Sequence, residues 1–116
     1  MNLTHHDGGR KGYWHPASRT ISTRRGLTIA EYKSTLTHEI AHAFHGDHYC
    51  HGHYKQRQER RADKWAANLL LSPRDVEEAL IFNPYPAVAA YDLEVTQHLL
   101  ETWLRTNHEK ITTQPH

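Results

Sequence analysis

A capped helix that carries two histidines one turn apart constrains this chain more than any other feature. Thr28 and Glu31 have the spacing of a capping box, which predicts a helix over residues 29–45. His38 and His42 lie four residues apart within that helix, so their directions differ by only about 40°. Both imidazoles therefore point to one side of the helix, where they can share one metal ion.

The residues from His38 to His42 read His-Glu-Ile-Ala-His, which has the form H-E-x-x-H. Glu39 lies on the adjoining face, near the metal but not needed to bind it, where a general base for the attacking water should sit. The alternative is an exposed histidine-rich face, or histidines bonded within a core. We favour the metal because the motif falls on a capped helix with an apolar stripe that we expect to be buried. That stripe consists of Leu36, Ile40 and Phe44.

Composition supports metal chemistry and excludes several other classes. Histidine accounts for 12 of 116 residues, and half of these lie between residues 38 and 53. The formal net charge of +1 gives no electrostatic basis for a nucleic-acid or membrane partner. The sequence has no apolar run near 18 residues, and Cys50 is the single cysteine, so we expect neither a membrane span nor a signal peptide. We therefore expect a soluble, cytoplasmic protein.

The remaining sequence predicts one mostly helical α+β domain over residues 1–116. Aromatic and β-branched residues around a turn predict a hairpin or edge strands over 13–15 and 19–23. Further helices are predicted over 56–71, from Ser72 as N-cap to the break at 83–86, over 88–91 and over 96–105. Residues 47–54 are expected to form a loop, 1–12 a flexible arm and 106–116 a flexible tail.

Two residues compete to be the third ligand of the metal. A catalytic zinc site takes three protein ligands and leaves one position for water. His48 lies six residues after His42, whereas Glu59 opens the next predicted helix. Asp63 follows Glu59 by one helical turn, so one carboxylate can bind the metal and the other can contact a ligand histidine. The alternative is that both carboxylates are solvated partners of neighbouring basic residues.

The spacing of His38, His42 and His48 resembles that of the metzincin peptidases. His45 stands where those enzymes have a glycine, and no methionine follows to form their characteristic turn. The same spacing also resembles the three-histidine site of the bacterial rRNA-processing metal endoribonucleases, in which a glycine replaces Glu39.

The pair formed by Glu59 and Asp63 resembles the E-x-x-x-D arrangement of gluzincin peptidases. That resemblance implies that Glu59 binds the metal and that Asp63 orients His38. We favour Glu59 over His48 as the third ligand.

Two segments together resemble the ImmA/IrrE family of metallopeptidases. Residues 37–43 read THEIAHA and residues 59–73 read ERRADKWAANLLLSP. The family pairs H-E-x-x-H with a downstream E-x-x-A-(N/D)-x-F-A-x-x-L-L-x-P. Trp65 replaces the usual phenylalanine and Ser72 the usual methionine. The resemblance covers roughly residues 13–105.

This resemblance implies a zinc-dependent endopeptidase, a short member of the phage or mobile-element type. The implied fold is a minimal gluzincin-like core, with a small N-terminal sheet, the H-E-x-x-H helix, a glutamate-bearing helix and C-terminal packing helices. His38, His42 and Glu59 would hold Zn²⁺, and Glu39 would accept a proton from the attacking water. Family members cleave a partner repressor, so the expected partner is a protein such as a helix-turn-helix repressor.

The oxyanion of such a reaction needs a second electrophile. The sequence does not choose among five candidates, which are Tyr13, His48, His51, His53 and Tyr54. Cys50 could be a fourth ligand of the metal, but we favour a thiol with no role in the site.

The pattern of apolar residues in the C-terminal segment resembles that of a helix-turn-helix. The helix that would recognise DNA has few basic residues, which argues against DNA binding. We instead expect its leucine and tryptophan stripe to pack on the metal-bearing helices.

Two other functions remain open. One is a metal-dependent nuclease or other hydrolase that uses His38, His42 and His48, and the other is a non-enzymatic, transcription-linked module with structural zinc. Glu39 argues against both, because neither site needs a carboxylate there.

Overall fold

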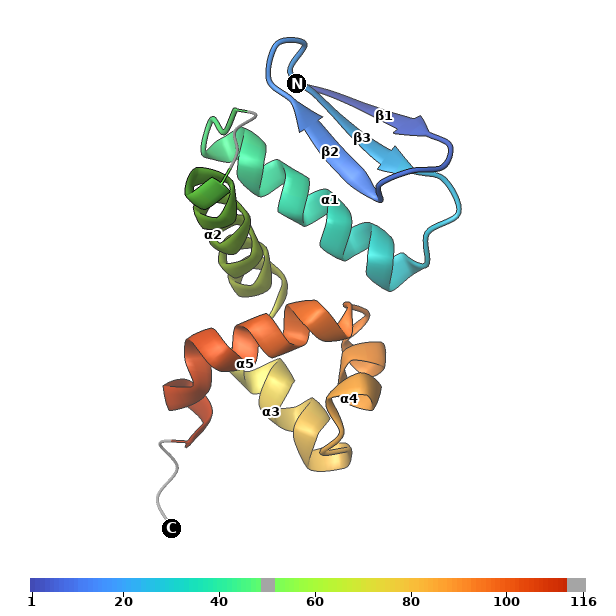
Figure 1. Cartoon of the computed structure of the whole chain (residues 1–116). Helices are drawn as coiled ribbons and strands as arrows, with labels where there is room; N and C mark the ends of the chain where they lie inside the picture. The colour runs from blue at the N-terminus through green and yellow to red at the C-terminus, as the bar shows by residue number, and fades with distance from the viewer. Residues whose placement is uncertain (49–51, 113–116) are drawn as a thin grey trace.

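A small sheet lies against the first of a series of helices, and the remaining helices extend away from it (Figure 1). The computed structural model describes residues 1–48 and 52–112. The predicted fold class, mostly helical α+β with an N-terminal sheet, is confirmed.

The sheet has three strands, with an edge strand on each side of a central strand. β2 (Gly12–His15) and β3 (Thr20–Arg24) form the predicted antiparallel hairpin. β1 (Asn2–His6) pairs with the other side of β3 in parallel, which gives the order β1-β3-β2. β2 is therefore an edge strand, and it packs against the first helix.

The N-terminal segment differs from the flexible arm predicted over residues 1–12, because residues 2–6 form β1. Nearly all side chains of this strand are exposed, so the segment lacks the apolar alternation by which a strand is recognised. Backbone pairing with β3 holds it instead. The rings of His5 and His6 add hydrogen bonds of 3.0 and 2.6 Å to hydroxyl groups of β3.

Five helices follow the sheet. They are α1 (Ile29–Phe44), α2 (Gly52–Leu70), α3 (Pro73–Phe82), α4 (Pro86–Leu93) and α5 (Gln97–Thr112). The helix caps and breaks found in the sequence set several of these bounds. Thr28 and Glu31 form the predicted capping box at the start of α1, and Ser72 caps α3. None of the described helices is both long and apolar enough to cross a membrane.

Three helices differ from their predicted bounds, and one of them, α4, spans Pro86–Leu93 where residues 88–91 were expected. α2 begins at Gly52, four residues before the expected start at residue 56, and residues 49–51 of the expected loop lie outside the described residues. α5 continues to Thr112, through part of the segment expected to be a flexible tail, and residues 113–116 lie outside the described residues.

The buried face of α1 is not the predicted apolar stripe. Phe44 is 64% exposed, and Leu36 and Ile40 are only half-buried. The fully buried side chains of α1 are instead Ser34, Thr37, Glu39, Ala41 and His42. The reason is that α1 is covered on two sides, by the sheet and by α2. The polar motif therefore lies in the interior, where polar groups need partners.

A hydrophobic core joins α2 to the C-terminal helices. Small residues of α2, Ala66 and Ala67, leave room for Leu99, Leu100 and Trp103 of α5. Residues from α3 and α4 complete the cluster, which is the packing predicted for the leucine and tryptophan stripe. Burial of this cluster fixes α5 against α2 and thereby sets where the first turn of α5 lies.

Candidate metal centre

The two histidines of the motif face one another across one turn of α1. The ring centroids of His38 and His42 are 4.8 Å apart, and their Nε2 atoms are separated by 3.1 Å. Glu59 of α2 approaches both rings, with its Oε2 2.8 Å from Nε2 of His38 and its Oε1 3.4 Å from Nε2 of His42. Among the described residues, these three side chains form a group able to hold a metal ion.

The donor atoms fit a tetrahedral zinc ion. Zinc bonds of about 2.0–2.1 Å place two ligand atoms roughly 3.3 Å apart in a tetrahedron. The three separations found here, 2.8, 3.1 and 3.4 Å, lie around that value, with Oε2 of Glu59 facing His38 and Oε1 facing His42. Two imidazoles and one carboxylate also form a donor set that catalytic zinc sites use, with the fourth position left for water. His48 is not part of the group.

Each of the two histidines also contacts a carboxylate through its second nitrogen. Nδ1 of His38 lies 2.8 Å from Oδ1 of Asp63, one turn after Glu59 on α2. Nδ1 of His42 lies 2.9 Å from Oδ2 of Asp47. Such contacts hold the ring so that Nε2 faces the metal and make that nitrogen a better donor.

Asp47 is a residue that the sequence analysis missed. It is buried, and its carboxylate also forms an ion pair with Arg61 of α2. The indole nitrogen of Trp14 donates a hydrogen bond of 3.1 Å to its backbone oxygen. A sequence signal did exist, because Asp47 follows the glycine that ends the helix, where the chain turns back toward His42.

Glu39 lies beside this group in a setting suited to proton transfer. It is 5% exposed, and burial raises the pKa of its carboxyl, an effect that the nearby histidines oppose. Glu39 borders a cavity of about 80 Å³ that His42 and Glu59 also line, and a second of about 480 Å³ that Asp63 also lines. A buried carboxyl open to both cavities can accept a proton and return it.

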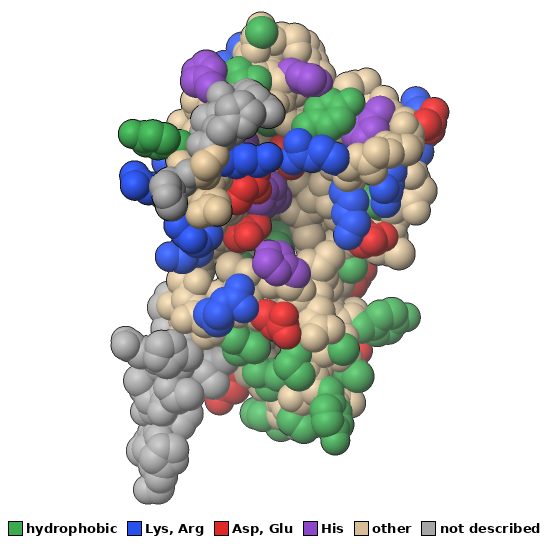
Figure 2. Space-filling model, viewed as in Figure 1, with side chains coloured by type: hydrophobic (Ala, Val, Ile, Leu, Met, Phe, Trp, Pro, Cys, Tyr) green, Lys and Arg blue, Asp and Glu red, His purple; other side chains and the backbone are tan. Residues whose placement is uncertain are grey.

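The charges of the cluster are strongly coupled. Burial alone would lower the pKa of His38, but hydrogen bonds to Asp63 and Glu59 outweigh it and raise the pKa to about 10. Hydrogen bonds from His38 and His42 lower the pKa of the Glu59 carboxyl. Figure 2 shows acidic and histidine side chains gathered at the centre of one face, with Lys and Arg around them. In the metal-free chain, the proton on His38 therefore offsets part of the negative charge of these carboxylates.

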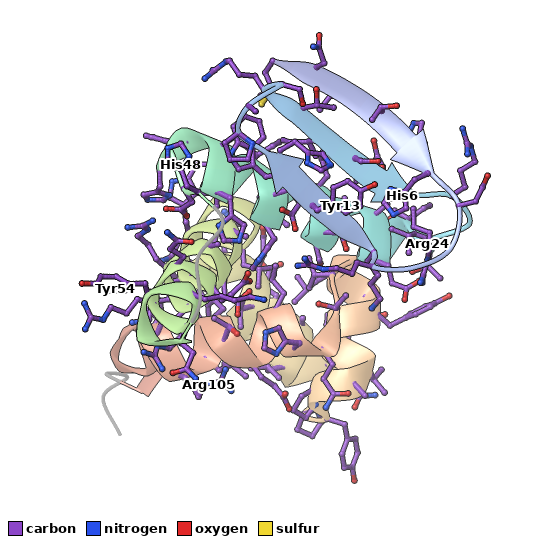
Figure 3. All side chains as sticks on the ribbon, turned by 45° about the horizontal axis from the view of Figure 1, so that its top comes forward. His6, Tyr13, Arg24, His48, Tyr54 and Arg105 are labelled. Atoms are coloured by element: carbon purple, nitrogen blue, oxygen red, sulfur yellow. The ribbon has the colours of Figure 1, made fainter. Side chains whose placement is uncertain are left out.

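Of the oxyanion donors suggested by the sequence, His48 and Tyr13 border the smaller cavity. The ring of Tyr13 stacks on His6 at 4.7 Å, on the sheet face opposite to that of Gly12 and Trp14, which contact α1 and the turn after it (Figure 3). The ring of Tyr13 therefore lies on the side of the sheet that does not contact α1. Tyr54 is 69% exposed and lies away from the cavity.

The other candidates in this region lie outside the described part of the chain. They are Cys50, His51 and the side chain of His53.

Comparison with known families agrees with the chemistry of the site. The family model for the IrrE N-terminal-like domain, Peptidase M78, matches residues 1–96. No curated protein matches the chain. The matched segment contains the H-E-x-x-H helix and the carboxylates of α2, and it covers most of the sequence. The chain therefore belongs to the ImmA/IrrE family of metallopeptidases.

Proposed function

We propose that this metallopeptidase is a zinc-dependent endopeptidase that cleaves a partner transcriptional repressor in the cytoplasm. The observation that carries the proposal is the position of Glu39. It is buried on the same helix as His38 and His42 and opens into the cavities beside the three donor atoms. A site that only held a metal for structure would have no use for this carboxyl.

His38, His42 and Glu59 would hold the zinc ion, and Asp63 and Asp47 would keep the two imidazoles in the orientation found here. When bound, zinc supplies a Lewis acid for the water and the scissile carbonyl. Glu39 takes the proton from the attacking water and passes it to the leaving amine.

The edge of β2 that does not pair with β3 supports endopeptidase activity, in which an extended substrate is cleaved away from its ends. β2 has β3 on one side only, and Tyr13 and Trp14 of this strand border the cavity that contains Glu39 and His42. An exposed strand edge can pair with an extended peptide through main-chain hydrogen bonds. Such pairing would lay a substrate backbone past Glu39 without requiring a chain end, as an endopeptidase needs.

The test uses the zinc-loaded chain and the repressor encoded beside its gene, with mass spectrometry of the products. The wild type should cut the repressor at one or a few bonds. Glu39→Gln should keep its zinc and lower kcat by about 10²–10⁴-fold, the usual contribution of a general base. Glu78→Gln is the matched control, because Glu78 pairs with Arg74 on the exposed side of α3, away from the site.

Zinc content separates the two possible ligand sets. Glu59→Ala should lose zinc and His48→Ala should retain it. Loss of zinc in His48→Ala alone, or full proteolysis by Glu39→Gln, would contradict the proposal.

A further inference from the structure

We propose that His98, in the first turn of α5, is a positioning residue for the metal site that acts through Asp63 on His38. The inference rests on the proposed metal site and adds a contact from the C-terminal helices to it.

Three side chains in series carry the inference. Nε2 of His98 lies 3.2 Å from Oδ2 of Asp63, and Oδ1 of the same carboxylate lies 2.8 Å from Nδ1 of His38. A carboxylate bonded through one oxygen can still turn about its own axis. A second bond to the other oxygen limits that rotation, so His98 holds Asp63 in the plane that suits the ring of His38.

The backbone around His98 is fixed independently of this contact. The amide of Thr96 donates a hydrogen bond of 3.1 Å to Ser34 of α1, and the Thr96 hydroxyl accepts one of 3.2 Å from the amide of Leu99. Leu99 and Leu100 are buried against α2. The first turn of α5 is therefore attached to both helices that carry the site.

The His98 ring itself contributes little to packing, because its side chain is 67% exposed. Its replacement therefore tests the hydrogen bond rather than the core. His98 also lies two residues beyond the segment that matches the family model, residues 1–96. The contact thus comes from a part of the chain outside that match.

The experiment measures zinc affinity of the full chain by competition with a chromophoric chelator. His98→Ala should weaken binding about three- to tenfold, less than the 10–100-fold typical of a direct partner of a ligand. His98→Gln can place an amide N–H near the position of Nε2 and should stay within about twofold of wild type. Gln97→Ala, an exposed neighbour whose side chain bonds Glu101, should leave the affinity unchanged.

A cycle with Asp63→Asn separates positioning from general stability. If His98 acts through Asp63, then His98→Ala should have no further effect on zinc affinity in the Asp63→Asn background. Equal affinity of wild type and His98→Ala, or independent losses in the cycle, would overturn this inference alone. A wild-type chain that binds no zinc would overturn the proposed function as well.

Discussion

Nδ1 of His42 lies 2.9 Å from Oδ2 of Asp47, which follows it by only five residues. Asp47 thus contacts Nδ1 of His42 in the way that Asp63 contacts Nδ1 of His38, although the two carboxylates come from different segments. The carboxylate of Asp47 also pairs with Arg61. One buried side chain therefore connects the turn after α1, the second histidine and α2.

Removing the charge of Asp47 should weaken the metal site. We expect Asp47→Asn to lower zinc affinity about 10–100-fold, because an amide is a poorer hydrogen-bond acceptor for the imidazole and leaves Arg61 without its counter-charge. Competition with a chelator measures the change. Asp92→Asn, on the exposed side of α4, is the control and should bind zinc as the wild type does. A wild-type affinity in Asp47→Asn would mean that the contact does not orient His42.

The stability of the metal-free chain should fall as the pH rises. The folded-state pKa of His38 is raised from the ordinary 6.5 to about 10, with burial opposing the hydrogen bonds to Asp63 and Glu59. The protonated ring therefore stabilises the fold fully below pH 6.5, and this contribution is lost as the pH rises through about 10. The measurement is the difference in Tm between wild type and His38→Gln without metal. That difference should decrease over this range, and a constant difference would contradict the assignment.

Zinc binding should show the opposite dependence on pH. The metal must displace the proton of His38, so the affinity should rise about tenfold per pH unit for each proton released. Titrations at several pH values, with the chelator corrected for its own protonation, check the slope. A flat profile between pH 6.5 and 9 would show that His38 is not protonated in the free chain.

Helical spacing explains why much of the site was predictable. His38 and His42, and likewise Glu59 and Asp63, are each four residues apart on one helix, so sequence alone places each pair on one face. The contact between the two pairs could be inferred only from the family resemblance, because it depends on how α1 packs on α2.

Contacts that depend on tertiary structure were not predictable from local patterns, although Gly46 marked the turn that leads to Asp47. Asp47 reaches His42 because Gly46 adopts a positive φ of 66° and turns the chain back, and because Trp14 and Arg61 hold it there. Phe44 is exposed although it continues an apolar stripe, because α2 and the sheet cover other sides of α1. β1 is polar and pairs in parallel with β3, so no local pattern marks it.

His48 should be the residue that stabilises the oxyanion. His48 and Tyr13 both border the cavity of Glu39, but the ring of Tyr13 stacks on His6 over the opposite side of the sheet. We expect His48→Ala to lower kcat about 10²-fold, with little change in KM or zinc content, since loss of one oxyanion donor has that effect. Tyr13→Phe is the control and should keep kcat within about twofold. A large loss in Tyr13→Phe and none in His48→Ala would reverse the assignment.

Gly12 should be needed for the close contact between β2 and α1. A Cβ built at Gly12 would lie 2.5 Å from Cγ2 of Thr35 and 3.3 Å from both Cγ of Glu39 and the backbone oxygen of Ser22. Thr35 is β-branched and stiff within a helix, so the strand must shift away from α1 to relieve the clash. We expect Gly12→Ala to lower the free energy of unfolding by about 1–3 kcal/mol, the usual cost of overpacking.

A second substitution identifies the clash that causes this loss. Thr35→Ser removes Cγ2, so the double variant Gly12→Ala/Thr35→Ser should recover much of the stability that Gly12→Ala loses. Urea denaturation of both single variants and the double variant gives the coupling energy. Additive effects would place the cost elsewhere, in the contact with Glu39 or the Ser22 backbone. In that case Gly12→Ala should also displace the general base, and kcat should fall more than stability does.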